Sequence, residues 1–116
     1  MTEDERERER LHYIEQSIAR IEQYTGGSRD TFLGEPIVQD AVLRRLETLA
    51  DATTKLSDAL KARHTDIPWR EVYGFRNVAA HAYEHVDLSR VWEIVQDYLP
   101  QLKAVIHEEL ERSSAP

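Results

Sequence analysis

Residues 36–62 read PIVQDAVLRRLETLADATTKLSDALKA, and this stretch decides the fold class. A stripe of mostly apolar side chains recurs three and four positions apart, which is the spacing of one face of an α-helix. They are Ile37, Ala41, Val42, Leu46, Leu49, Ala52, Thr53, Leu56 and Leu60. Pro36 suits the first turn of a helix, where an N–H group is not needed. We therefore predict one long helix from Pro36 to about Ala62.

The segment before this stretch has the same helical period. Leu11, Ile14, Ile18 and Ile21 recur at helical spacing within residues 3–25. Thr2 and Glu5 have the spacing of a capping box, with Thr2 as the N-cap. The pair Gly26-Gly27 is typical of a helix end. Residues 3–25 are therefore predicted to form an amphipathic helix, followed by a connector over 28–34 with one helical turn near its centre.

Proline and aspartate mark the helices that follow. Pro68 predicts the start of a third helix over 68–84, and Asp87 is placed to cap a fourth. Pro100 either kinks the fourth helix or starts a fifth segment over 101–112. Short connections favour antiparallel neighbours. The sequence thus predicts an all-α protein, an antiparallel bundle of four to five helices.

Length and composition narrow the class further. A chain of 116 residues predicts a single domain over 1–116. It contains no cysteine, which excludes disulfides and thiolate metal sites. No apolar run approaches the ~20 residues of a membrane span, and the N-terminus is too charged for a secretory signal. We expect a cytoplasmic protein with no membrane partner.

The charge balance limits nucleic-acid binding. The net charge is −7, whereas non-specific binding to nucleic acid is mainly electrostatic and needs cations. DNA is therefore not an expected partner. Any RNA would have to be met by local cations such as Arg44, Arg45, Arg70 and Arg76.

Residues 76–83 read Arg-Asn-Val-Ala-Ala-His-Ala-Tyr and lie within the third predicted helix. At about 100° per residue, the arginine, asparagine, histidine and tyrosine of this octapeptide line one arc. The opposite side carries the expected core contacts, which are Phe75, Val78, Ala79 and Ala82. Ala80 lies on the polar arc and is small enough to let a substrate come close.

These polar residue types suit chemistry on a phosphodiester. Arg76 can hold a phosphate with two parallel hydrogen bonds, and His81 can move protons near neutral pH. Asn77 could orient the histidine or bind the phosphate. Transesterification needs both an acid and a base, which a two-fold dimer could supply by joining two copies of the arc. A plain solvated helix face is the alternative interpretation of the same residues.

A metal site is the other alternative, because His81 and His85 are four residues apart. That spacing can hold zinc, but the glutamate of the metalloprotease pattern and a third ligand are missing. No metal and no cofactor are therefore expected.

The octapeptide resembles the motif of the HepT-like toxins, a branch of the HEPN ribonuclease superfamily. That motif is Arg, four residues, His, one residue and Tyr, and it is complete here from Arg76 to Tyr83. Three flanking segments are also similar to the family: Leu43-Arg44-Arg45-Leu46-Glu47, Ile67-Pro68-Trp69-Arg70, and Val86-Asp87-Leu88 followed by Val91-Trp92. The resemblance covers most of residues 10–110.

This resemblance implies a HEPN-like all-α homodimer with its active cleft at the dimer interface. It implies a metal-independent endoribonuclease, the toxin of a type VII-like toxin–antitoxin pair, with Arg76 and His81 as catalytic residues and Asn77 in support. The implied partner is a minimal nucleotidyltransferase antitoxin that transfers AMP to the motif tyrosine, Tyr83. Two alternatives stay open, namely a non-catalytic HEPN binding module and a regulatory partner of a nucleotidyltransferase.

Overall fold

The fold is entirely helical in the part of the chain that the structure describes. The computed structural model describes residues 1–85 and 87–114, with the backbone alone for Tyr83, Glu84, His85 and Ser114. Its helices are α1 (Glu3–Thr25), α2 (Arg29–Gly34), α3 (Pro36–Thr54), α4 (Asp58–Arg63), α5 (Trp69–His85), α6 (Leu88–Asp97) and α7 (Leu99–Ser114). Because these residues contain helices and no strand, the predicted all-α class is confirmed.

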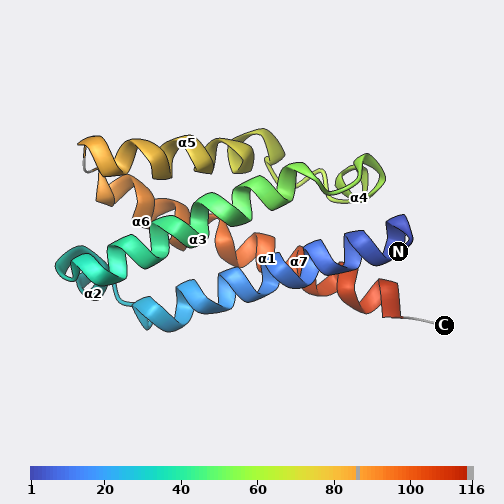
Figure 1. Cartoon of the computed structure of the whole chain (residues 1–116), viewed down its shortest axis with the longest axis horizontal. Helices are drawn as coiled ribbons and strands as arrows, with labels where there is room; N and C mark the ends of the chain where they lie inside the picture. The colour runs from blue at the N-terminus through green and yellow to red at the C-terminus, as the bar shows by residue number, and fades with distance from the viewer. Residues whose placement is uncertain (86, 115–116) are drawn as a thin grey trace.

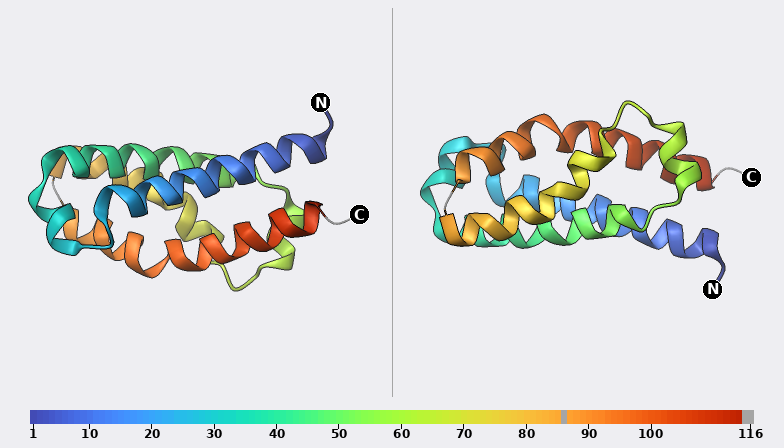
Figure 2. Two further views of the ribbon diagram at one scale, coloured as in Figure 1. Left: turned by 90° about the horizontal axis from the view of Figure 1, so that it is seen from below. Right: turned by 90° about the horizontal axis from the view of Figure 1, so that it is seen from above.

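The longer helices run along one axis of an elongated molecule of 46 × 27 × 24 Å (Figure 1). Helix α3 packs against α1 on one side and α5 on the other, and α7 packs against α1 and α6. Figure 2 shows both chain ends at the same end of the bundle, while α2 lies at the opposite end. Among the described residues, no helix combines the length and apolarity that a membrane crossing requires.

Local capping signals form where the sequence predicts them. The Thr2 hydroxyl accepts a hydrogen bond from the backbone N–H of Glu5 at 3.1 Å, and α1 begins at the next residue after Thr2. Gly26 ends the same helix with a left-handed φ of 58°, a conformation that costs glycine little. Asp87 accepts from the N–H of Arg90 at the start of α6. The boundaries of these helices follow from nearby residues.

The single helix predicted over residues 36–62 is wrong, because α3 and α4 are separated by three residues. Ser57 starts α4 by accepting from the N–H of Leu60 at 3.1 Å. The N–H of Ser57 donates to the Glu7 carboxylate of α1 at 2.6 Å and so cannot continue α3. The connector over 28–34 is also more ordered than expected, since most of it forms α2.

Pro100 lies in the first turn of α7, which begins at Leu99. Of the two sequence alternatives, the start of a new helix is therefore correct and a kink is not. Tyr98 separates α6 from α7, and its N–H still donates to the Ile94 carbonyl at 3.0 Å. Its hydroxyl donates to Glu71 on α5, which raises the pKa of Tyr98.

The core lies between the long helices and is built from aliphatic side chains with a few aromatic anchors. Phe32 of α2 stacks on Trp92 of α6 with ring centroids 5.7 Å apart, and Phe75 of α5 meets Tyr98 edge to face at 5.3 Å. Trp92 is buried and Trp69 is partly buried against the core. Both tryptophans therefore anchor the packing of the helices.

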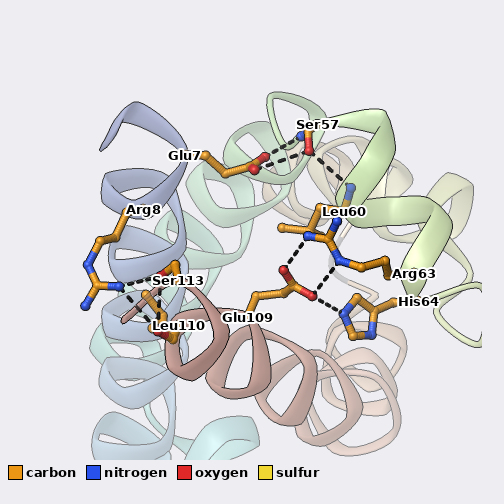
Figure 3. A network of polar contacts seen from close by, with 9 residues as sticks. All are labelled: Glu7, Arg8, Ser57, Leu60, Arg63, His64, Glu109, Leu110 and Ser113. Carbon is orange, nitrogen blue, oxygen red and sulfur yellow. Dashed lines mark hydrogen bonds and ion pairs between the residues drawn. The ribbon is translucent and has the colours of Figure 1, made fainter. Parts of the chain in front are cut away.

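A buried carboxylate ties α4 to α7, as Figure 3 shows. Glu109 is only 4% exposed. It accepts two hydrogen bonds from Arg63, at 2.6 and 3.2 Å, and lies 2.6 Å from His64 Nε2. Burial acts to raise the pKa of Glu109, but the hydrogen bonds from Arg63 and His64 outweigh it and lower that pKa. His64 is thus a largely buried partner of Glu109.

Gly74 lies inside the continuous helix α5, and no packing contact within the described chain accounts for the glycine. No heavy atom outside its own local backbone lies within 4 Å of a Cβ built at this position, so close helix approach does not explain the glycine. Gly74→Ala is expected to stabilise the fold by about 0.5–1 kcal/mol, because glycine loses more backbone entropy than alanine in a helix. Thermal unfolding checks this as a rise in Tm of a few degrees.

Ala80→Gly, at an exposed position of the same helix, is the matched control and should lower Tm by a similar amount. A lower Tm for Gly74→Ala would contradict the prediction and would indicate that another surface needs the glycine.

Candidate functional site

The octapeptide lies in the second half of α5, and the start of this helix is held firmly. The indole N–H of Trp69 donates to the His64 carbonyl at 3.0 Å, and the N–H of Val72 donates to the Pro68 carbonyl at 3.0 Å. Because His64 also contacts the buried Glu109, the turn before α5 is tied to α7. The helix therefore enters the bundle in a fixed direction.

The octapeptide divides into a buried and an exposed face, as the helical wheel predicts. Phe75, Ala79 and Ala82 are buried and Val78 is partly buried. Arg76, Asn77, Ala80 and His81 are exposed. The predicted core contacts are thus confirmed, and three of the four polar residues of the arc face outward beside a small alanine.

Tyr83 and His85 continue α5 in the backbone, but their side chains lie outside the described part of the chain. The predicted modification at Tyr83 and the alternative pairing of His81 with His85 therefore stay predictions. Among the described side chains, no three histidine, aspartate or glutamate residues are grouped closely enough to hold a metal ion.

Arg76 reaches across to α3 and meets Asp51. Its Nη1 atom lies 3.8 Å from Asp51 Oδ1, and the two side chains are 63% and 48% exposed. Asp51 is shared with Lys55, whose Nζ lies 3.7 Å away. Exposed ion pairs of this kind contribute about 0–1 kcal/mol. A phosphate could therefore replace the Asp51 carboxylate at little energetic cost.

A groove of about 690 Å³ opens beside this ion pair. We call it the α1–α3–α5 groove. Its lining residues come from α1 (Arg6, Glu9, Arg10, Tyr13), from α3 (Arg44, Glu47, Thr48, Asp51, Ala52) with its C-cap residue (Lys55), and from α5 (Arg76). Five of these side chains are cationic and three are acidic, in a chain whose net charge is −7. The groove is thus more positive than the protein around it.

Of the four cations proposed from sequence to meet RNA, two line this groove. Arg44 and Arg76 face it from α3 and α5. Arg45 lies elsewhere, with Arg20, beside Tyr24, where hydrogen bonds from Arg20 and then Arg45 lower the pKa of that phenol. Arg70 is exposed in the first turn of α5 and does not line the groove.

Arg76 is the motif residue that lines the groove, and the register of α3 against α5 shows which end of the groove lies nearer to His81. The two helices are antiparallel neighbours (Figure 1). Arg44 precedes Asp51 by seven residues, so it lies about 10 Å from Asp51 along α3. His81 follows Arg76 by five residues and lies about 7–8 Å along α5 in the same direction. Arg44 is therefore nearly level with the histidine end of the motif.

Comparison with known proteins identifies the family of the chain. The family model described as ribonuclease HepT-like matches residues 14–109, which include every helix except parts of the first and last. This chain belongs to the HepT-like family. No solved structure matches the chain significantly.

Two relatives of similar length to the HepT-like chain are named as ribonucleases. It is 35% identical to a protein of Thermococcus cleftensis named as a probable ribonuclease HepT, over 80% of this chain and 86% of the relative. It is 28% identical to a protein of Caldanaerobacter subterraneus named as a candidate RNase, over 87% of this chain and 90% of the relative.

A third relative is larger than this chain. It is a protein of Methanocaldococcus jannaschii named as a gamma-glutamylcyclotransferase and candidate RNase, 36% identical over 89% of this chain. The HepT-like chain spans only about half of that relative, 48% of its length.

Sequence reasoning missed the contribution of α1 and Asp51 to this surface. The alternating Glu and Arg residues at 5–10 indicate only a solvated helix turn, because the acids offset the arginines. In the fold, Arg6 and Arg10 face the same groove as Arg76. Only the packing of α1 on α3 reveals this, so no local signal in the sequence could have identified it.

Proposed function

We propose that this HepT-like chain is a metal-independent endoribonuclease and the toxin of a two-gene toxin–antitoxin system. The observation that carries the proposal is the exposed placement of Arg76, Asn77 and His81 on α5, with Arg76 lining a cationic groove. Membership of a family described as ribonuclease HepT-like supports RNA as the substrate class.

The proposed reaction is transesterification at a phosphodiester of RNA. His81 takes the proton of a ribose 2′-hydroxyl, and the 2′-oxygen attacks the neighbouring phosphorus. The bond to the 5′-oxygen breaks, and that oxygen leaves with a proton from an acid. The products are a 2′,3′-cyclic phosphate and a free 5′-hydroxyl. Arg76 holds the non-bridging oxygens and stabilises the charge that grows on them, while Asn77 orients the phosphate or the histidine.

A homodimer supplies the second proton-transfer group in this proposal. One chain offers a single motif histidine, whereas the reaction needs a base and an acid. In a two-fold dimer the same patch faces itself, so two α5 helices would bring two copies of Arg76 and His81 to one cleft. Mixed dimers of Arg76→Ala and His81→Ala chains would reveal such sharing.

RNA cleavage by the purified chain in the presence of EDTA tests the proposal. We expect products with 2′,3′-cyclic phosphate and 5′-hydroxyl ends, and no cleavage of the all-deoxy analogue, which lacks the attacking hydroxyl. Expression of the chain alone should slow growth, and His81→Ala should relieve that effect. Products with 3′-hydroxyl ends, or growth inhibition unchanged by His81→Ala, would contradict the proposed mechanism.

Inactivation by AMP transfer to Tyr83 is the second part of the proposal. The partner nucleotidyltransferase would join the Tyr83 oxygen to the α-phosphorus of ATP, with diphosphate as the leaving group. Tyr83 follows His81 by two residues on α5, so the added nucleotide would bring bulk and negative charge to the RNA site. RNA would then be excluded by occlusion and repulsion.

Intact-mass analysis after co-expression with the partner checks this prediction. We expect the mass to rise by AMP groups, the Tyr83→Phe chain to gain none, and modified protein to lose RNA cleavage. Tyr73→Phe, at another tyrosine of α5, is the matched control and should be modified like the parent. An unchanged mass gain in Tyr83→Phe would place the modification elsewhere.

A further inference from the structure

The α1–α3–α5 groove extends well beyond the motif and needs an explanation of its own. We propose that it binds the sugar–phosphate backbone of single-stranded RNA on both sides of the scissile phosphate, and that Asp51 occupies the phosphate position at Arg76 until RNA displaces it. This inference rests on the proposed RNA substrate. It adds the path of the strand and the residues that follow it.

The α3 wall of the groove is a continuous ridge. Arg44, Thr48, Asp51 and Lys55 are spaced by four, three and four residues and all line the groove. This spacing places them along one face of α3 and its C-cap residue, Lys55. From Arg44 to Lys55 the ridge measures about 16 Å. That length matches about four or five stacked nucleotides at ~3.4 Å each. Arg76 meets the ridge at Asp51, about 10 Å from its Arg44 end.

The α1 wall brings further cations to the Lys55 end. Arg10 Nη1 donates to the Lys55 carbonyl at 3.2 Å, which sets the register of α1 against α3. Arg6 lies one turn before Arg10 on the same helix and also lines the groove. Cations therefore flank Arg76 on both sides, with Arg44 towards one end and Arg6, Arg10 and Lys55 towards the other.

Tyr13 supplies an aromatic surface near the centre of this path. It is 40% exposed, one of few large apolar side chains open to solvent in the described chain. It follows Arg10 by three residues on α1, which runs antiparallel to α3 (Figure 1), so it is about level with Ala52 and close to Asp51. Exposed aromatic rings next to a cationic track suit bases of a single strand, which stack without sequence preference.

Asp51 is the feature that distinguishes a phosphate path from an ordinary charged surface. Its carboxylate is shared by two cations, Lys55 at 3.7 Å and Arg76 at 3.8 Å. Both distances exceed a good hydrogen bond, so the two cations hold the carboxylate loosely and an incoming phosphate can displace it. Bound RNA must therefore overcome repulsion from Asp51, and removal of its charge should favour binding.

Changes of opposite sign in the same groove provide the test. Binding of a short, unstructured, fluorescently labelled RNA is measured by anisotropy in the His81→Ala chain, which keeps the RNA intact. Arg10→Ala with Arg44→Ala should weaken binding about tenfold and lower the salt slope by about 0.7 for each lost phosphate contact. Asp51→Asn, which keeps the side-chain shape, should tighten binding several-fold.

The matched control replaces two exposed arginines that lie off the groove. Arg29→Ala with Arg112→Ala changes the net charge as much as the groove variant does, but on α2 and α7. Its RNA affinity should stay close to that of the His81→Ala chain. Circular dichroism of each variant shows whether it is folded, and Asp51→Asn gives a gain of binding that unfolding cannot produce.

The outcomes separate this inference from the proposed function. Three results would overturn the groove proposal. They are an equal loss of RNA affinity in the groove and control variants, a lower RNA affinity in Asp51→Asn, and no RNA binding at all. If the parent cleaves RNA but the groove variants bind normally, only the inference is wrong. If the parent does not cleave RNA but binding depends on the groove in the predicted directions, the inference stands and the proposed nuclease activity fails.

Discussion

Replacement of His81 by alanine is expected to lower the rate of RNA cleavage by about 10²–10⁴-fold, the usual contribution of a positioned acid or base. Arg76→Ala is expected to lower it by about 10²–10³-fold, as for other donors that stabilise transition-state charge. Both side chains are exposed on α5, so neither change should alter the free energy of unfolding by more than about 0.5 kcal/mol. The loss would therefore be chemical.

His12→Ala is the matched control for the histidine. His12 is exposed on α1, where it lies 3.5 Å from Glu15, and it does not belong to the motif. Its removal should leave cleavage within about twofold of the parent, well below the change expected for a proton-transfer group. Equal activity of His81→Ala and His12→Ala chains would refute the assignment. Rates should be measured at saturating RNA, so that a change in binding is not mistaken for a change in chemistry.

Replacement of Glu109 by alanine should have the largest effect on stability. Removal of one partner of a buried ion pair typically costs about 3–5 kcal/mol, because the other charge stays buried and unpaired. His64 would lose its partner in a largely buried position. Arg63 is one-third exposed and could turn towards water, so we expect the lower end of this range. Urea unfolding would show it as a lower midpoint with an unchanged slope.

Glu108→Ala is the control for this change. Glu108 precedes Glu109 on α7 and is exposed, so its loss should change stability by less than about 0.5 kcal/mol. If the two variants unfold at the same urea concentration, the network in Figure 3 does not stabilise the fold.

Glu109 also predicts the pH dependence of stability. Its pKa is lower in the folded chain than its ordinary value. A carboxyl with a depressed folded pKa contributes its stability above the unfolded pKa, and this contribution is lost as the pH falls through the folded value. The parent should therefore lose stability in acid, below about pH 4.3, the ordinary value for glutamate. Glu109→Gln should show a shallower loss over the same range.

The parts of the fold that depend on near neighbours could be predicted from sequence. The cap at Thr2, the left-handed end at Gly26 and the cap at Asp87 all involve residues within a few positions. The two faces of α5 were predictable for the same reason, since helical geometry alone sorts Arg76 and His81 from the buried residues. Local geometry is visible in a sequence because it needs no distant partner.

The parts that failed depend on distant partners. The break between α3 and α4 is held by Glu7, fifty residues from Ser57. The burial of His64 follows from Glu109, which is forty-five residues away. Ser57 also carries a local capping signal for α4, but no pattern near Ser57 or His64 indicates the contacts with Glu7 and Glu109, because helix packing alone brings these partners together.

The sequence likewise predicts the motif residues of the candidate site but not the residues around them. The motif residues of α5 are visible in the sequence, and the family resemblance assigns them roles. Their surroundings are not, because Asp51 contacts Arg76 only through the packing of α3 on α5. Arg10 reaches the groove only through the packing of α1 on α3.

The central claim is that the chain cleaves RNA without a metal ion and with His81 as a catalytic residue. The most direct test compares cleavage of one fluorescent RNA by the parent and by the His81→Ala chain, both treated with a chelator. We expect the parent to cut the RNA in EDTA, to leave 2′,3′-cyclic phosphate ends, and to lose this activity by at least about 10²-fold in His81→Ala. No cleavage by the parent in EDTA, with cleavage restored by a divalent metal ion, would contradict the claim, and so would equal rates for the two chains.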